Sequence, residues 1–107
     1  MHNEIEHWTQ RIKAGFLKYG LPGYMEDGVK NWVVDGIEPG SFLCGLFAND
    51  LMYACGQADF INRHLIFEWA GFLYNDVPSE CKGSWQKMDE WQGLKKMQGP
   101  PTEEPTT

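Results

Sequence analysis

Two residues near the middle of the chain have the side-chain types that nucleophilic catalysis uses. His64 falls on the polar edge of a predicted helix and Cys81 in a predicted loop, so the imidazole and the thiol could meet. The simpler interpretation is a surface histidine and a half-buried cysteine, because no motif brings the two together. We therefore predict no catalytic residue and rank an enzyme last among the candidate functions.

Metal and phosphate chemistry are not predicted either. A structural zinc site needs cysteines or histidines at short spacing, and this chain has three of each, far apart. Gly36 and Gly40 belong to a turn that lacks the Gly-Lys-Ser/Thr ending of a phosphate-binding loop. The sequence thus predicts neither a metal ion nor a cofactor.

Several polar residues lie within apolar stretches, and these are Asn49, Asp50, Gln57, Asp59, Asn62, Arg63 and Asn75. Buried polar groups need partners, since leaving one unpaired costs on the order of 1–3 kcal/mol. One interpretation is structural: the aspartates cap helices, the asparagines satisfy turns and Arg63 pairs with an acid. The alternative is a pocket for a nucleotide-like anion, with Arg63 holding the anion and Tyr74 or Trp69 as a stacking wall.

A second candidate surface lies between residues 77 and 91. Trp85 and Trp91 stand there near Lys82, Lys87 and Glu90, and aromatic rings among charges are typical of protein interfaces. The full set of hypothesised ligand- or partner-binding residues is Asn49, Asp50, Asp59, Asn62, Arg63, Tyr74, Asn75, Lys82, Trp85 and Trp91.

The spacing of apolar residues predicts an all-α fold, a compact bundle of about five irregularly packed helices. Bulky side chains recur at intervals of three and four over residues 3–19, 24–36, 42–56, 60–74 and 84–97. Asp50 leaves open whether 42–56 is one buried helix or two. Ser41, Asp59 and Ser84 are the predicted N-caps of the helices that follow them.

Length and composition predict one domain over residues 1–97, followed by a disordered tail over residues 98–107 that has no hydrophobic residue to bury. No signal peptide or membrane-length apolar run is found, and three widely spaced cysteines argue against a secreted disulfide scaffold. We therefore expect a cytoplasmic protein with no membrane partner. The net charge of −6, with scattered acids, argues against nucleic-acid binding.

Short motifs over residues 21–91 resemble a family of small uncharacterised proteins encoded by phages and prophages. The chain has Leu-Pro-Gly at 21–23, Ile-Glu-Pro-Gly-Ser-Phe-Leu at 37–43, Asn-Asp-Leu at 49–51 with Ala54, Ala-Asp at 58–59 with Asn62, Phe-Leu-Tyr-Asn at 72–75 with Pro78, and Cys-x-Gly-Ser at 81–84 with Trp91. Gln57 and Lys82 depart from the pattern, which usually has arginine and tryptophan at these positions. The resemblance implies an accessory protein made by a phage inside a bacterium.

A helical domain of this kind, without catalytic residues, most economically acts by binding. The first hypothesis is that it binds a host macromolecule, with a host protein as the expected partner, for example a protein of a defence system. The alternative is a small-ligand protein that sequesters an anion. A second copy of the chain, forming a homodimer, is a further candidate partner.

Overall fold

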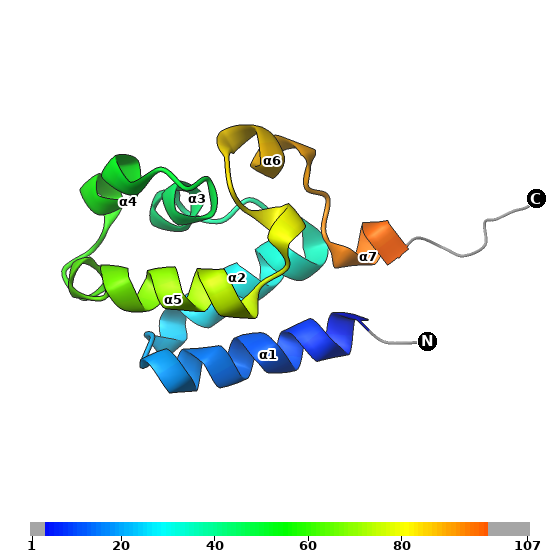
Figure 1. The fold of residues 1–107 in the computed structure, drawn as a ribbon, viewed down its shortest axis with the longest axis horizontal. Coiled ribbons are helices and arrows are strands. Elements are labelled where there is room, and N and C mark those ends of the chain that lie inside the picture. Colours follow the sequence, from blue (N-terminus) through cyan, green and yellow to red (C-terminus); the bar gives the residue numbers. More distant parts are fainter. Residues whose placement is uncertain (1–3, 99–107) are drawn as a thin grey trace, which may run out of the picture.

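The computed structural model describes residues 4–98, and all regular structure within this range is helical (Figure 1). The predicted all-α fold is therefore confirmed, while the predicted disordered tail lies outside the described residues except for Gln98, which ends the last helix. The elements are α1 Glu4–Tyr19, η1 Gly23–Met25, α2 Glu26–Lys30, η2 Asn31–Asp35, α3 Ser41–Phe47, α4 Leu51–Gln57, η3 Asn62–His64, α5 Ile66–Asp76, η4 Ser79–Cys81, α6 Trp85–Glu90 and α7 Leu94–Gln98.

The core is centred on α5, which lies alongside α1 (Figure 1). Trp69 and Phe72 of α5 are fully buried, and Phe16 of α1 meets both rings edge-on, at 5.6 and 5.2 Å between centroids. Phe42 of α3 contacts the Trp69 ring from another side, at 5.8 Å. Edge-to-face aromatic pairs add about 0.5–1.5 kcal/mol each beyond the burial of their area. Aromatic side chains therefore form the centre of this core.

Two glycines allow α1 and α5 to approach closely. A Cβ atom at Gly15 would lie 2.7 Å from the Phe72 ring, and one at Gly71 would lie 2.9 Å from the Tyr19 ring. Both distances are shorter than a carbon–carbon van der Waals contact. The helix propensity lost at these glycines is thus offset by tight packing between the two helices.

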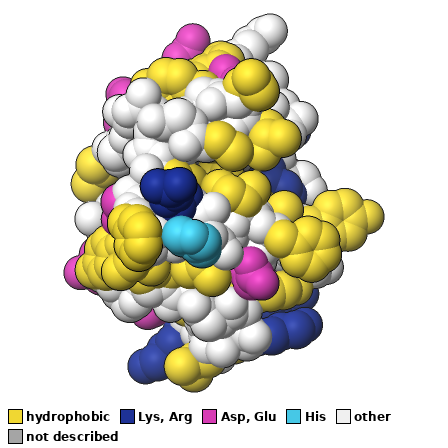
Figure 2. Space-filling view, turned by 90° about the vertical axis from the view of Figure 1, so that its left-hand side faces the viewer, with side chains coloured by type: hydrophobic (Ala, Val, Ile, Leu, Met, Phe, Trp, Pro, Cys, Tyr) yellow, Lys and Arg dark blue, Asp and Glu magenta, His cyan; other side chains and the backbone are white. Residues whose placement is uncertain are grey.

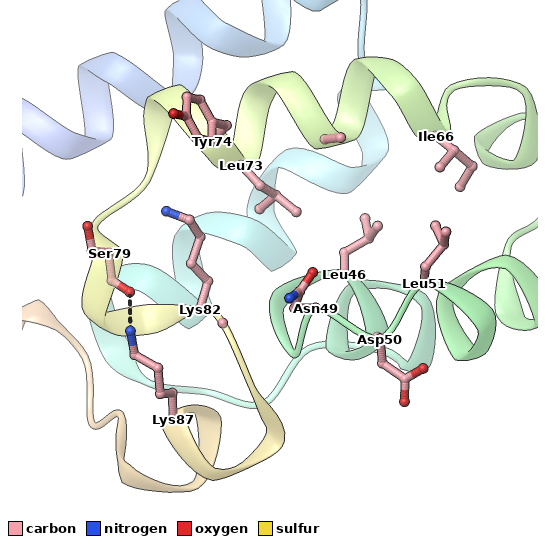
Figure 3. A pocket seen from close by; sticks show the side chains of 13 residues that line it. Leu46, Asn49, Asp50, Leu51, Ile66, Leu73, Tyr74, Ser79, Lys82 and Lys87 are labelled. Carbon is pink, nitrogen blue, oxygen red and sulfur yellow. Dashed lines mark hydrogen bonds between the residues drawn. The ribbon is translucent and has the colours of Figure 1, made fainter.

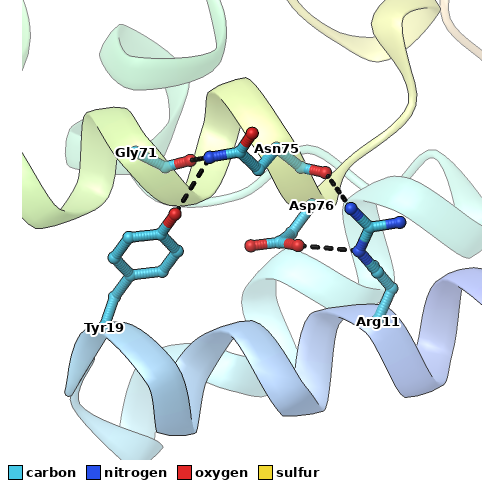
Figure 4. Close-up of polar contacts among 5 residues, drawn as sticks. All are labelled: Arg11, Tyr19, Gly71, Asn75 and Asp76. Atoms are coloured by element: carbon cyan, nitrogen blue, oxygen red, sulfur yellow. Dashed lines mark hydrogen bonds and ion pairs between the residues drawn. The ribbon is translucent and has the colours of Figure 1, made fainter.

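Polar contacts tie the same two helices together at their rim (Figure 4). Arg11 Nε donates to Asp76 Oδ1 at 2.8 Å, and Arg11 Nη2 donates to the Asn75 carbonyl at 2.9 Å. The Asn75 amide donates to the Tyr19 hydroxyl at 2.9 Å and to the Gly71 carbonyl at 3.0 Å. Asn75, predicted to satisfy backbone or to bind a ligand, is therefore part of the α1–α5 contact.

The segment 42–56 forms two helices, α3 and α4, and not one. The sequence had left this question open. Asn49 adopts a left-handed conformation with φ of 60°, and Asp50 caps α4 by accepting a hydrogen bond from the Tyr53 amide at 3.2 Å. A Cβ atom at Gly45 would lie 2.8 Å from the backbone of Ala54, so α3 and α4 pack against each other closely. The predicted capping role of Asp50 is confirmed.

Three predicted helix boundaries were wrong. Helix α3 begins at Ser41 itself, after Gly40, so Ser41 is not its cap. Asp59 accepts a hydrogen bond from the Asn62 amide at 2.7 Å in the turn that leads into η3, and α5 begins only at Ile66, so Asp59 does not cap α5. The segment 84–97 is broken around Gly93, which has φ of 97°, into α6 and α7. The spacing of apolar residues alone does not reveal these local helix boundaries.

A cavity between α5 and the turn from α3 to α4

A cavity of about 430 Å³ opens between α5, the α3–α4 turn and the segment 79–87 (Figure 3). Its apolar wall consists of Leu46, Leu51, Ile66, Ala70 and Leu73, and its more polar side of Gly45, Asn49, Asp50, Tyr74, Ser79, Lys82, Gly83 and Lys87. The volume falls in the range of about 300–1,000 Å³ that small-molecule sites occupy. The cavity is therefore a candidate binding site.

Three contacts hold the walls of this cavity in place. The Gly83 amide donates to the Phe47 carbonyl at 2.7 Å, which joins the segment 79–87 to the end of α3. The Trp85 indole donates to Asp50 Oδ2 at 3.0 Å, and its ring meets Tyr53 edge-on at 5.5 Å. These contacts join the segment 79–87 to α3 and α4 and so fix the side of the cavity that faces α5.

Two lysines line the polar side and differ in their contacts. Lys87 donates to the Ser79 carbonyl at 3.1 Å and so fastens η4 to α6. Lys82 is half-buried, and its ammonium group makes no hydrogen bond or ion pair with any described residue. Its ammonium group extends toward Tyr74 on α5 (Figure 3). Lys82 is thus a cation at the cavity without a protein partner.

The structure brings four of the predicted site residues together, since Asn49, Asp50, Tyr74 and Lys82 all line the cavity. Trp85 supports them from outside through its hydrogen bond to Asp50, and its side chain is 45% exposed. Tyr74 is also exposed, at the rim of the cavity.

Trp91 does not fit the hypothesised partner surface. It is buried, and its indole donates to the Trp32 carbonyl at 2.9 Å. The residues around 77–91 therefore offer less exposed aromatic area than the sequence suggested.

Two other predicted site residues, Asp59 and Asn62, form a separate hydrogen-bond network with Tyr24. The Tyr24 hydroxyl donates to Asp59 Oδ2 at 2.6 Å, and the buried Asn62 accepts from the Trp69 indole at 2.9 Å. The hydrogen bond from Tyr24 holds the pKa of Asp59 below its ordinary value, and the same bond raises the pKa of Tyr24. This network joins the surface to the core and lies outside the cavity.

The predicted anion pocket around Arg63 is not formed. Trp69 is fully buried and cannot be a stacking wall for a ligand, and Arg63 does not line the cavity. The predicted pairing of Arg63 with an acid is also wrong, because its guanidinium lies over the Phe60 ring, 5.8 Å from the centroid, without an ion pair among the described residues.

Large apolar side chains gather at one end of the molecule, around α4, η3 and the start of α5. Figure 2 looks at this end and shows several groups of hydrophobic side chains, with a basic side chain and a histidine between them. Four of the hydrophobic side chains are Met52, Phe60, Ile61 and Phe67, and we call this set the apolar end. Met52 and Phe67 are exposed by 83% and 86%, so they contribute little to folding. Their apolar area is available to a partner.

The thiol and imidazole that could have formed a nucleophilic pair have other partners. Cys81 is fully buried and its thiol donates to the Pro78 carbonyl at 3.1 Å, while the His64 ring bonds the Phe60 carbonyl at 2.9 Å. Burial raises the pKa of the Cys81 thiol to about 12, so the thiolate is scarcely populated at neutral pH. Within residues 4–98, no three or more metal-ligating side chains converge.

Several functional candidates were missed at the level of sequence. The sequence pattern predicted ordinary core positions for Leu46, Ile66 and Leu73. Only the tertiary arrangement leaves a cavity between them. Tyr24 read as part of a helical stripe, although its hydroxyl is the partner of Asp59. No local signal distinguishes these roles, because both depend on segments far apart in the chain.

Among the described residues, no helix has the length and apolar character needed to cross a membrane. No protein-family model matches the chain, and no curated protein and no solved structure matches it either.

Proposed function

We propose that the chain acts by binding another protein through its apolar end. The observation that carries this proposal is the exposure of Met52, Phe60, Ile61 and Phe67 together at one end of a small body. Clustered apolar area of this kind is uncommon on a monomer unless it binds something. A protein partner offers an apolar surface large enough to cover side chains that come from three different segments.

The charge next to these side chains favours a partner surface that carries an acid. Arg63 lies over the Phe60 ring and has no ion pair with a described residue. Arginine and aromatic residues are enriched at the energetic centres of interfaces, and a guanidinium can bind a carboxylate with two hydrogen bonds. Arg63 is therefore assigned a role at the interface in place of the anion pocket predicted from sequence.

The partner that we propose is a protein of the bacterium in which the chain is made, with a component of host defence as the specific candidate. The resemblance to phage and prophage proteins supports this choice, and it implies that the chain acts in the bacterial cytoplasm. A second copy of the chain could cover the same surface, and the experiment below separates the two occupants.

The proposal is tested by affinity capture from a bacterial lysate with the unaltered chain and with a Phe60→Glu/Phe67→Glu double variant. We expect the unaltered chain to retain a stoichiometric host protein and the double variant to lose it, because buried carboxylates without partners are strongly unfavourable. Mutation of central interface anchors typically costs about 2 kcal/mol or more each, which corresponds to about 30-fold in affinity.

The matched control is Met97→Glu, which also places a carboxylate at an exposed apolar position, on α7 near the opposite end of the molecule (Figure 1). This variant should retain the partner. Equal capture by all three proteins, or no stoichiometric host protein at all, would contradict the proposal. Light scattering that shows a dimer, lost only in the double variant, would assign the surface to self-association instead.

A further inference from the structure

The cavity next to α5 has a polarity that suits a particular class of small molecule. One side of it is apolar, from Leu46, Ile66 and Leu73, and the other side presents Lys82. A ligand that fills it must therefore combine an apolar body with a group that an ammonium can bind. This argument is independent of the proposed protein interface, because Met52, Phe60, Ile61 and Phe67 do not line the cavity.

The charges at the cavity favour an anion with a single negative charge. Two cations line the cavity, Lys82 and Lys87, and the hydrogen bond from Lys87 to the neutral Ser79 carbonyl leaves the charge of Lys87 in place. Asp50 adds one negative charge to the lining, because its carboxylate accepts hydrogen bonds only from neutral donors of Trp85 and Tyr53, so the formal net charge of the lining is +1. A phosphate ester carries a charge of about −1.5 to −2 at neutral pH, which exceeds the net charge of the lining. A carboxylate, with one charge, is the better match.

A second free donor lines the same cavity. Asn49 is held at the α3–α4 turn by its left-handed backbone, and its side-chain amide makes no hydrogen bond with a described residue. Amide N–H groups and ammonium groups both donate to carboxylate oxygens. Asn49 and Lys82 thus offer two unused kinds of donor from separate segments.

We propose that this cavity binds a monocarboxylate with an unbranched apolar body, such as a medium-chain alkanoate. The carboxylate lies at Lys82 with Asn49 as the additional donor, and the hydrocarbon chain lies along Leu46, Ile66 and Leu73. Burial of each methylene contributes about 0.8 kcal/mol, so the apolar wall supplies much of the affinity and the lysine selects for the anion.

The proposal is tested by NMR titration of the folded chain with sodium octanoate and, separately, with 1-octanol, which has the same length without the charge. We expect octanoate to shift the methyl signals of Leu46, Ile66 and Leu73. In Lys82→Met, the octanoate dissociation constant should rise about 10- to 100-fold, the range expected for loss of one charged hydrogen bond, while that of octanol should change little.

Two further variants complete the test. Lys96→Met removes an exposed lysine outside the cavity and should leave octanoate affinity unchanged. Ala70→Phe adds a ring at the exposed edge of the cavity wall and should weaken octanoate and octanol alike. Absence of octanoate binding, equal loss in Lys82→Met and Lys96→Met, or shifts confined to Met52 and Phe67 would overturn the proposal. The shift map of the unaltered protein decides the matter even where a variant fails to fold.

Discussion

The two sides of α5 look alike in the sequence and differ in the structure. Toward α1, the side chains of Trp69 and Phe72 are fully enclosed and glycines bring the helices into direct contact. Toward α3 and α4, Ile66 and Leu73 line a cavity instead. Both sets recur at helical spacing, so hydrophobic periodicity identifies a helix with two apolar sides without showing which one is filled.

The difference arises from what each partner helix brings to the contact. Helix α1 has Gly15 at its crossing with α5, so the backbones approach and the aromatic rings interlock. Gly45 of α3 instead packs against Ala54 of α4, and α3 contacts α5 through the Phe42 and Trp69 rings while Ile66 and Leu73 line the cavity. We infer that the α1 side provides stability and the cavity side is available for binding.

The largest expected effect separates these two sides directly. Phe72→Ala should lower the free energy of unfolding by about 3–5 kcal/mol, because it leaves a void among Phe16, Trp69 and Gly15. Tyr74→Ala, at an exposed position on the rim of the cavity, should change it by no more than about 0.5 kcal/mol. Urea unfolding followed by tryptophan fluorescence measures both. Losses of similar size would show that the cavity side is also a packed core.

Smaller changes in the free energy of unfolding are expected at two glycines, and the two changes have opposite signs. Gly15→Ala should destabilise the chain by about 1–3 kcal/mol, since the new methyl group overlaps the Phe72 ring, which is buried and cannot move aside. Gly56→Ala should stabilise it by about 0.4–1 kcal/mol, because nothing lies within 4 Å of a Cβ atom there and alanine favours the helix.

Thermal unfolding of the two alanine variants beside the unaltered chain provides the measurement. A shift of both midpoints in the same direction would mean that helix propensity, and not the closeness of α1 to α5, governs these positions. The interpretation of α5 as a helix with one filled side would then lose its main support.

The sequence was sufficient for the helical class and for part of the core, but not for the site. Ile12, Phe16 and Trp69 recur at helical spacing within the predicted helices 3–19 and 60–74, and all three are buried, whereas Ile61 in the same pattern is exposed. The boundaries of α5 were missed because Asp59 serves a short turn and does not cap α5. The cavity was missed because it depends on the Gly83–Phe47 hydrogen bond between residues 36 positions apart, and local patterns carry no information about such contacts.

The smallest effect concerns the hydrogen bond between Tyr24 and Asp59, where the packed core meets the apolar end. The Tyr24 hydroxyl is the main reason that the pKa of Asp59 is lowered, so this bond stabilises the fold above the ordinary pKa of an aspartate and is lost as pH falls through the lowered value. The pKa of Tyr24 is raised, so its contribution is complete below about pH 10 and is lost as pH rises through the raised value.

Tyr24→Phe should therefore flatten the thermal-stability profile at both extremes of pH. Tyr74→Phe, which removes a hydroxyl without a hydrogen-bond partner among the described residues, should leave the profile as it is. Identical profiles for the unaltered chain and Tyr24→Phe would contradict the prediction that this hydrogen bond stabilises the fold.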